Sequence, residues 1–287
     1  MNFNSIILFA AAILPAIALG IFVFKKDRVE KEPVPLLLKL FFFGVLSCVP
    51  VILVSSPLCD FIDSLFAGSI TIEGDVIYYD STATLWTYTA AKYFIGVALV
   101  EELGKFAFLY FATKNNKNFN SLFDGIIYSV FVSLGFAALE NVLYVFNGGL
   151  QVALLRAFLS VPGHMFFGVL MGYYYSLWHV TEKAKLWEKK FKDEGVIPQH
   201  RSISSKGHMT MCLLMPILAH GAYDFCCSIG SGLMTLVFII LEVFLYVHCF
   251  GKINKISKAD GYTNNYAILM FIKEYPETAG YFMTDNH

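Results

Sequence analysis

Charged residues are scarce in this chain. They make up 15% of its 287 residues, whereas 57% are hydrophobic, and the mean hydropathy is +0.61. A soluble domain carries about 25% charged residues, so this composition excludes an ordinary soluble protein. The 28 Phe and 16 Tyr residues suit lipid and the membrane interface. We therefore predict an all-α fold, a polytopic membrane helix bundle.

Recognisable metal-binding motifs are also absent. The six cysteines show no spacing typical of a metal site, and the chain contains no His-Glu-x-x-His motif. Cysteines within apolar runs behave as small hydrophobic residues. We expect no cofactor and no nucleic-acid partner.

Long apolar runs predict about seven transmembrane helices, because each run can cross a hydrocarbon core of about 30 Å. Their ranges are 6–24, 36–54, 85–113, 122–146, 152–179, 209–228 and 233–250. Residues 1–250 are thus expected to form a single transmembrane domain. Residues 251–287 would form a cytoplasmic tail, in which 266–272 is predicted as a small docking strand.

Basic residues are missing from one side of this arrangement. All but three of the 21 Lys and Arg residues fall on the other side, which the positive-inside rule makes cytoplasmic. The amino terminus is then outside and the carboxyl terminus inside. The outer segment 55–84 is expected to hold an interfacial helix at 61–66 or a hairpin at 70–79. The three exceptions lie within spans: Lys92, Lys105 and Arg156, the last expected to snorkel or to pair with an outer acid.

The third predicted span carries Glu101, Glu102 and Lys105. Each charge at bilayer depth costs about 2.5–3.5 kcal/mol on insertion scales, so such residues usually serve a function. Helical spacing places both carboxylates within reach of Lys105, while the two carboxylates point about 100° apart. One Glu can therefore do chemistry while the other is held structurally. An ion pair that only fixes helix packing has the same spacing.

The fourth and sixth predicted spans add further ionisable groups. Glu140 and Asn141 lie in a stripe of small and polar residues, which marks a face packed against other helices. His220 and Asp224 are four residues apart on one helix face, so the carboxylate can orient the imidazole.

The fifth predicted span contains Pro162 and His164. The proline removes one backbone hydrogen bond and should free a carbonyl near Phe158. His164 steps by four to Gly168 and Gly172, a small-residue face that permits close helix approach. The imidazole is therefore expected to face the bundle interior, as a packing residue or as part of a site.

The ionisable groups also share a depth. At about 1.5 Å rise per residue, Glu101, His164 and His220 lie within roughly 3 Å of the midplane. Glu140 and Asp224 lie about 8 Å toward the outside on the same scale. A cluster at one depth on four helices predicts a site, because residues used only for packing would scatter.

Three kinds of chemistry fit this cluster. A carboxylate base and a hydrogen-bond donor can activate water for hydrolysis and stabilise an oxyanion. Two imidazoles and one or two carboxylates would also suit zinc. Buried acids can relay protons in a proton-coupled carrier.

The motifs resemble those of a known family. They are Glu101-Glu102-x-x-Lys105, Phe136-x-x-x-Glu140-Asn141, His164 and His220-x-x-x-Asp224, all within residues 90–228. This order is similar to that of the PrsW-type glutamic intramembrane proteases, part of the CAAX protease and bacteriocin-processing superfamily. The CAAX enzymes show Glu-Glu-x-x-x-Arg and Phe-x-x-x-His. Lys105 comes one position earlier and Glu140 replaces the histidine, which favours the PrsW type over prenyl processing.

The resemblance implies a multi-pass endopeptidase of the bacterial plasma membrane, metal-independent in its better understood relatives. Its substrate would be a single-span membrane protein, of the anti-sigma factor type, cut first on the extracytoplasmic side.

On this basis Glu101 is predicted as the general base, with Glu102 and Lys105 shaping its electrostatics. His164 is predicted as the second catalytic group, and Glu140 as an acid partner or a structural anchor. The residues predicted to orient water or stabilise the oxyanion are His220, Asn141 and Asp224.

Overall fold

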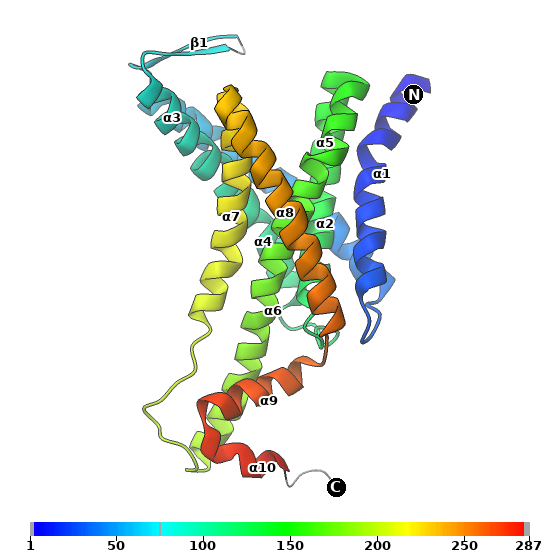
Figure 1. The fold of residues 1–287 in the computed structure, drawn as a ribbon, viewed down its shortest axis with the longest axis vertical. Coiled ribbons are helices and arrows are strands. Elements are labelled where there is room, and N and C mark those ends of the chain that lie inside the picture. The colour runs from blue at the N-terminus through cyan, green and yellow to red at the C-terminus, as the bar shows by residue number, and fades with distance from the viewer. Residues whose placement is uncertain (1–2, 75, 284–287) are drawn as a thin grey trace.

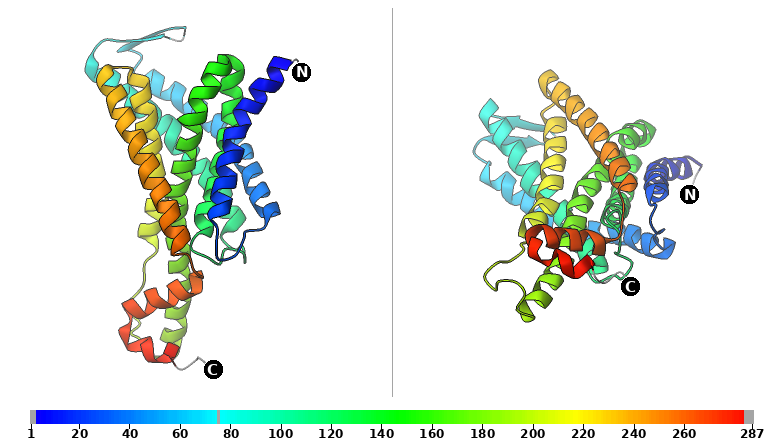
Figure 2. Two further views of the ribbon diagram at one scale, coloured as in Figure 1. Left: turned by 45° about the vertical axis from the view of Figure 1, so that its right-hand side comes forward. Right: turned by 60° about the horizontal axis from the view of Figure 1, so that its bottom comes forward.

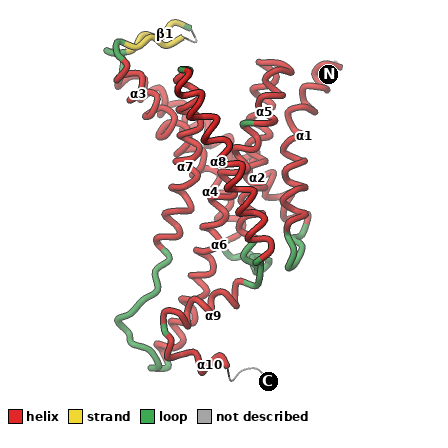
Figure 3. Tube along the Cα trace, viewed as in Figure 1, coloured by secondary structure: helices red, strands yellow, loops and turns green. Residues whose placement is uncertain are grey.

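The computed structural model of the chain describes residues 3–74 and 76–283, which are almost entirely helical (Figure 1; Figure 3). The helices of the first half are α1 (Phe3–Lys26), α2 (Val34–Leu65), α3 (Thr82–Ala90), the π-helical η1 (Ala91–Leu99), α4 (Val100–Thr113) and α5 (Asp124–Phe158). Those of the second half are α6 (Ser160–Asp193), α7 (Lys206–Ile229), α8 (Gly232–Lys258), α9 (Thr263–Glu274), the 3₁₀ turn η2 (Pro276–Thr278) and α10 (Ala279–Met283). The predicted all-α membrane fold is confirmed.

The number of spans stays a prediction. Five segments of the described chain are long and apolar enough to cross a membrane: 5–26, 34–65, 124–193, 206–229 and 232–258. The fourth and fifth predicted spans fall together in 124–193, which turns back on itself at Gly149 (φ 71°). The predicted third span is not among the five; it is divided into α3, η1 and α4.

Helices α5 and α6 form the centre of the bundle (Figure 2). Nearly every side chain from Asp124 to Ala138, and from Val161 to Gly172, is buried. Helices α1 and α2 pack on α5, while α7 and α9 pack on α6. The residues that carry ionisable groups are therefore presented to the protein interior, as their small-residue surroundings predicted.

Two glycines bring α6 against α5. A Cβ atom on Gly172 would lie 2.3 Å from the carbonyl oxygen of Gly125, and one on Gly168 would lie 2.8 Å from Ser133 Oγ. A side chain at either position would push the helices apart. The close approach predicted from the four-residue spacing is confirmed, and it turns His164 into the bundle.

Pro162 has the expected effect on its helix. The helix is divided into α5 and α6 at Leu159, whose φ of −114° and ψ of −67° lie away from ideal helical values. The carbonyl oxygen of Phe158 accepts a hydrogen bond of 2.5 Å from the hydroxyl of Tyr246 on α8. The carbonyl freed near the proline is thus satisfied by a side chain of another helix.

The outer segment contains the hairpin that was one of its two predicted forms. Strand β1 (Ile70–Glu73) pairs antiparallel with β2 (Val76–Tyr79). Residues 61–66, the other candidate, extend the end of α2 through Leu65 and its cap at Phe66.

The strand predicted at 266–272 is wrong, because this segment is part of the helix α9. Ala267 and Phe271 are both fully buried in a cluster with Ala184 and Phe191 of α6. Leu269, midway between them, is 63% exposed, whereas in a strand it would share their buried face; the pattern therefore matches a helix.

Candidate active site

Glu101 and Glu102 begin α4 directly after the π-helical η1. π-Helical turns are rare and often lie at functional sites. Gly96 within η1 allows a close contact with α2, since a Cβ atom there would lie 2.8 Å from Cys59 Sγ. The wide turn and this contact set the rotation at which the two carboxylates enter the bundle.

The ammonium group of Lys105 is the centre of the buried charges. Its Nζ donates to Glu102 Oε1 at 2.8 Å and to Glu101 Oε2 at 3.2 Å. It also lies 3.2 Å from His164 Nδ1 and 4.1 Å from the centroid of the Phe136 ring. Lys105 and Glu102 are fully buried, so this pair has no contact with solvent.

His220 of α7 lies between three carboxylates. Its Nδ1 is 2.8 Å from Glu102 Oε1, while its Nε2 is 3.3 Å from Asp224 Oδ2 and 3.9 Å from Glu101 Oε2. Because Nδ1 contacts a buried carboxylate, the ring is oriented with Nε2 toward Glu101.

Glu140 of α5 is held from the opposite side. Its Oε2 is 2.8 Å from His164 Nε2 and 2.9 Å from Arg156 Nη2. Arg156 follows the reversal at Gly149, which returns the chain toward the acid on the first leg of the same helix. Of the two alternatives predicted for Arg156, pairing with an acid is the one observed, and the acid is Glu140.

Both ring nitrogens of His164 are occupied. Lys105 donates to Nδ1, so the ring proton lies on Nε2 and is donated to Glu140. His164 thus connects the two groups of charges, and its ring centroid lies 5.4 Å from that of His220.

Asn141 lies behind this cluster. It is fully buried, its Oδ1 accepts from Arg156 Nε at 2.9 Å, and its Nδ2 donates to the Ala12 carbonyl of α1 at 2.7 Å. These contacts place Asn141 as a support for Arg156 and α1.

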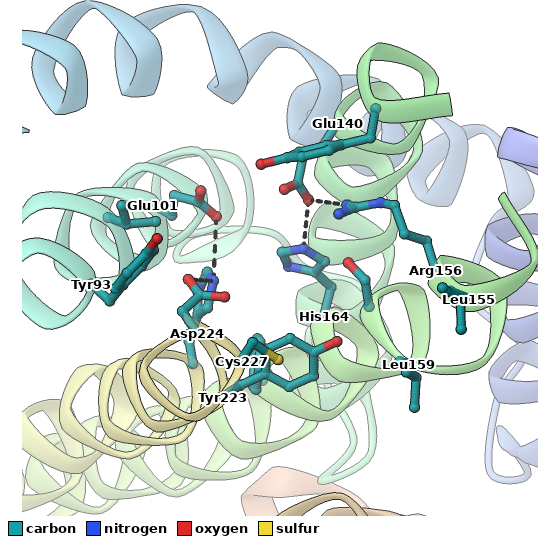
Figure 4. A pocket seen from close by; sticks show the side chains of 15 residues that line it. Tyr93, Glu101, Glu140, Leu155, Arg156, Leu159, His164, Tyr223, Asp224 and Cys227 are labelled. Carbon is teal, nitrogen blue, oxygen red and sulfur yellow. Dashed lines mark hydrogen bonds and ion pairs between the residues drawn. The ribbon is translucent and has the colours of Figure 1, made fainter. Parts of the chain in front are cut away.

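A cavity of about 330 Å³ separates the two groups of charges (Figure 4). Helices η1, α4, α5, α6 and α7 each contribute to its wall. The acidic, basic and imidazole side chains in its lining are Glu101, Glu140, Arg156, His164, His220 and Asp224. Five predicted site residues therefore line one pocket, with Glu102, Lys105 and Asn141 behind it.

Comparison with known proteins identifies the family of the chain. A family model described as "PrsW family intramembrane metalloprotease" matches residues 32–249. The chain is 34% identical over 263 residues to Protease PrsW of Clostridioides difficile, covering 90% of this chain and 92% of that protein. It is 30% identical over 261 residues to Protease PrsW of Geobacillus kaustophilus, with 91% and 96% covered.

The chain belongs to the PrsW protease family. Protease PrsW of Bacillus subtilis is a further relative, 29% identical over 250 residues, with 87% of this chain and 94% of that protein covered. No solved structure gives a significant match. This member of the PrsW family is thus a multi-pass membrane protease, as the four motifs indicated, and the carrier alternative is not supported.

The family description contains the word metalloprotease, and three residues of the site carry groups that can bind a metal ion. Glu101, Glu102 and His220 each bring one ligand atom within 4.8 Å of the others, a donor set that suits zinc. However, the Lys105 ammonium already binds both carboxylates from a fully buried position. A divalent ion there would meet a fixed positive charge and would take away the partners of Lys105. The residues as arranged do not fit a metal ion.

Three tyrosines of the cavity wall were not predicted from the sequence as site residues: Tyr93, Tyr144 and Tyr223. Tyr144 stands four residues after Glu140, and its ring lies 4.1 Å from the Arg156 guanidinium carbon. Tyr93 stands eight residues before Glu101, and Tyr223 stands directly before Asp224. Helical spacing from the acids could have indicated Tyr93 and Tyr144, whereas nothing in the sequence distinguishes Tyr223 from other span tyrosines.

Proposed function

We propose that this PrsW-family protease hydrolyses a peptide bond of a single-span membrane protein, with a water molecule activated between Glu101 and His220. The observation that carries the proposal is their geometry. Glu101 and His220 Nε2 face each other across 3.9 Å at the cavity wall, each with a buried partner behind it.

Glu101 supplies the base. Its carboxylate takes one proton from water while the remaining hydroxide attacks the scissile carbonyl carbon. The oxyanion that forms accepts a hydrogen bond from His220 Nε2, and the Glu102 carboxylate at Nδ1 stabilises the donating form of the ring. As the carbon–nitrogen bond breaks, the proton on Glu101 passes to the leaving amine. The hydroxide from water thereby ends on the new carboxyl group, and its proton ends on the new amine.

His164 then has a different role from the predicted second catalytic group. Both of its nitrogens are engaged by Lys105 and Glu140. It fixes these two charges on opposite sides of the cavity, and Glu140 with Arg156 forms the wall that receives the substrate backbone. Asp224, near His220 Nε2, helps to orient the ring.

The proposed setting is a seven-span protein of the bacterial plasma membrane, with its amino terminus outside. The distribution of basic residues supports this topology. Under it the cavity lies in the outer half of the membrane, which suits an extracytoplasmic cut. An anti-sigma factor is the proposed substrate class, because the sequence motifs resemble those of proteases with that role.

The first experiment uses the purified protein in lipid nanodiscs and a single-span reporter that carries the outer juxtamembrane segment of an anti-sigma factor. Mass spectrometry maps the products. We expect Glu101→Gln to lower the cleavage rate by roughly 100-fold or more while the protein stays folded. Glu30→Gln, at an exposed glutamate outside the site, is the matched control and should cleave normally.

The same assay tests the conclusion that the site does not fit a metal ion, although Glu101, Glu102 and His220 each bring a ligand atom within 4.8 Å of the others. We expect cleavage to be unchanged by chelator. Loss of cleavage in chelator, restored by zinc, would replace the present mechanism. Equal cleavage by Glu101→Gln and the unmodified protein would remove the proposal altogether.

A further inference from the structure

Helix α8 carries an acid that the proposed chemistry does not use. Glu242 is 5% exposed, and neither of its carboxyl oxygens has a hydrogen-bond partner among the residues that the structure describes. Its neighbours on the helix, Ile239 and Val243, are 52% and 58% exposed, as expected for lipid-facing side chains. An ionisable group inside a membrane protein is costly to keep, and one without a partner is a candidate for binding.

Glu242 lies in a groove on the outside of the bundle. The groove has a volume of about 380 Å³ and is otherwise apolar, with walls that include Leu159, Phe238, Ile239, Val243 and Tyr246. We call it the α8 groove.

The α8 groove adjoins the catalytic cavity at one residue. Leu159 lines both the α8 groove and the catalytic cavity. It is also the residue between the end of α5 and the start of α6. The hydroxyl of Tyr246 on α8 donates a hydrogen bond to the Phe158 carbonyl and so connects the end of α5 to α8. A segment lying in the groove would therefore be separated from the catalytic cavity by Leu159 and by the Tyr223 ring, which packs on Phe238.

The chemistry of the groove restricts what occupies it. Lipid tails fill an apolar groove but offer no hydrogen bond to a carboxyl group. A transmembrane helix offers one only through a polar side chain or where its backbone is unwound, because its other backbone groups are satisfied internally. A peptide bond must also leave the helix to be cleaved. The α8 groove thus suits the part of a membrane segment where helix gives way to extended chain.

We propose that the α8 groove is the lateral docking site for the transmembrane segment of the substrate, and that Glu242 hydrogen-bonds a polar group of that segment at its unwound end. Leu159 is the side chain past which the extended chain enters the catalytic cavity. The inference rests on the proposed protease function, because it names the route by which the substrate of that site arrives.

The test compares two substrates with the same scissile sequence in nanodiscs. One is a single-span reporter, and the other is a short peptide without a membrane segment. Glu242→Leu should raise the KM for the reporter by roughly 3- to 15-fold, the range for one hydrogen bond inside a membrane protein, and leave the peptide unchanged. Glu242→Gln retains hydrogen-bonding capacity and should restore most of the reporter KM. Ile240→Leu, on an exposed part of the same helix, is the matched control.

Crosslinking identifies the occupant. A photo-crosslinker in place of Val243 should join the protein to the reporter. Crosslinks only between two copies of this chain would make the groove a dimer contact and overturn the inference. So would equal reporter KM values for Glu242→Leu and the unmodified protein, or an equal change for both substrates. Failure of the unmodified protein to cleave either substrate would instead contradict the proposed function.

Discussion

Two groups of acidic residues among those that the structure describes are neutralised in different ways. Around the catalytic cavity the acids contact cations or imidazoles: Lys105, Arg156, His164 and His220. The second group, which we call the junction cluster, consists of Asp27, Glu32, Asp124 and Asp260. It lies where the α1–α2 loop, the start of α5 and the end of α8 meet. Within the described residues none of its members forms an ion pair with a side chain.

Neutral donors surround the junction cluster instead. Tyr128 donates its hydroxyl proton to Glu32 Oε2 at 2.6 Å, and the backbone N–H of Phe123 donates to Asp260 at 2.9 Å. Burial raises the pKa of Glu32 from 4.5 to about 8, with the negative charges of Asp124 and Asp27 adding to the increase and the Tyr128 hydrogen bond opposing it. Burial likewise raises the pKa of Asp27 and of Asp260.

The two groups of acids thus differ in their partners, which are cations and imidazoles around the cavity and neutral donors in the junction cluster. Burial in the junction cluster favours the protonated form of Glu32. In the proposed mechanism the first group supplies the base, whereas the second group is expected to make the stability of the fold depend on pH.

The largest expected effect comes from removing the central cation. Lys105→Met leaves Glu101 and Glu102 without their ammonium partner in a fully buried position. Breaking a buried pair in this way costs roughly 3–5 kcal/mol. We expect a clearly lower thermal unfolding temperature in detergent, followed by intrinsic fluorescence, and no cleavage.

A double variant provides the control for this prediction. Lys105→Met with Glu102→Gln removes both charges of the pair and should unfold at a higher temperature than Lys105→Met alone. Unfolding of the single variant at the same temperature as the unmodified protein would show that the buried ion pairs do not hold the site together.

A smaller effect is expected in the junction cluster. The folded protein holds the Glu32 proton more tightly than the unfolded chain, because its pKa is raised in the folded state. The stability contributed by the neutral acid is present below about pH 4.5 and is lost as the pH rises through about 8. The unfolding temperature should therefore fall between about pH 4.5 and pH 8 and level off above that, and Glu32→Gln should reduce this fall. Glu30→Gln, at an exposed acid two residues earlier, should not; an equal slope in both variants would assign the pH dependence elsewhere.

Much of the site could be predicted from the sequence, because charge inside an apolar run is rare. This signal gave Glu101, Lys105 and Glu140 at once, and helical spacing placed His220 beside Asp224. Pro162 likewise predicted the freed Phe158 carbonyl, since a missing N–H has a fixed consequence for the backbone.

Contacts between helices could not be predicted in the same way. They depend on how each helix is rotated about its axis, which the π-helical η1 and the Gly149 reversal determine. The sequence therefore did not show that His220 contacts Glu102 while His164 contacts Glu140. Nor did it show that 266–272 is helical, because burial against α6 decides between helix and strand for so short an apolar segment.

The account assigns different roles to the two histidines. His220 takes part in the reaction, whereas His164 holds the charged groups around the cavity in place. The most direct test is the kcat of purified His220→Asn and His164→Asn on one reporter, with folding checked by thermal unfolding. We predict a loss of kcat of roughly 100-fold or more for His220→Asn and about 10-fold or less for His164→Asn. A severe loss in His164→Asn with nearly normal turnover in His220→Asn would contradict the account.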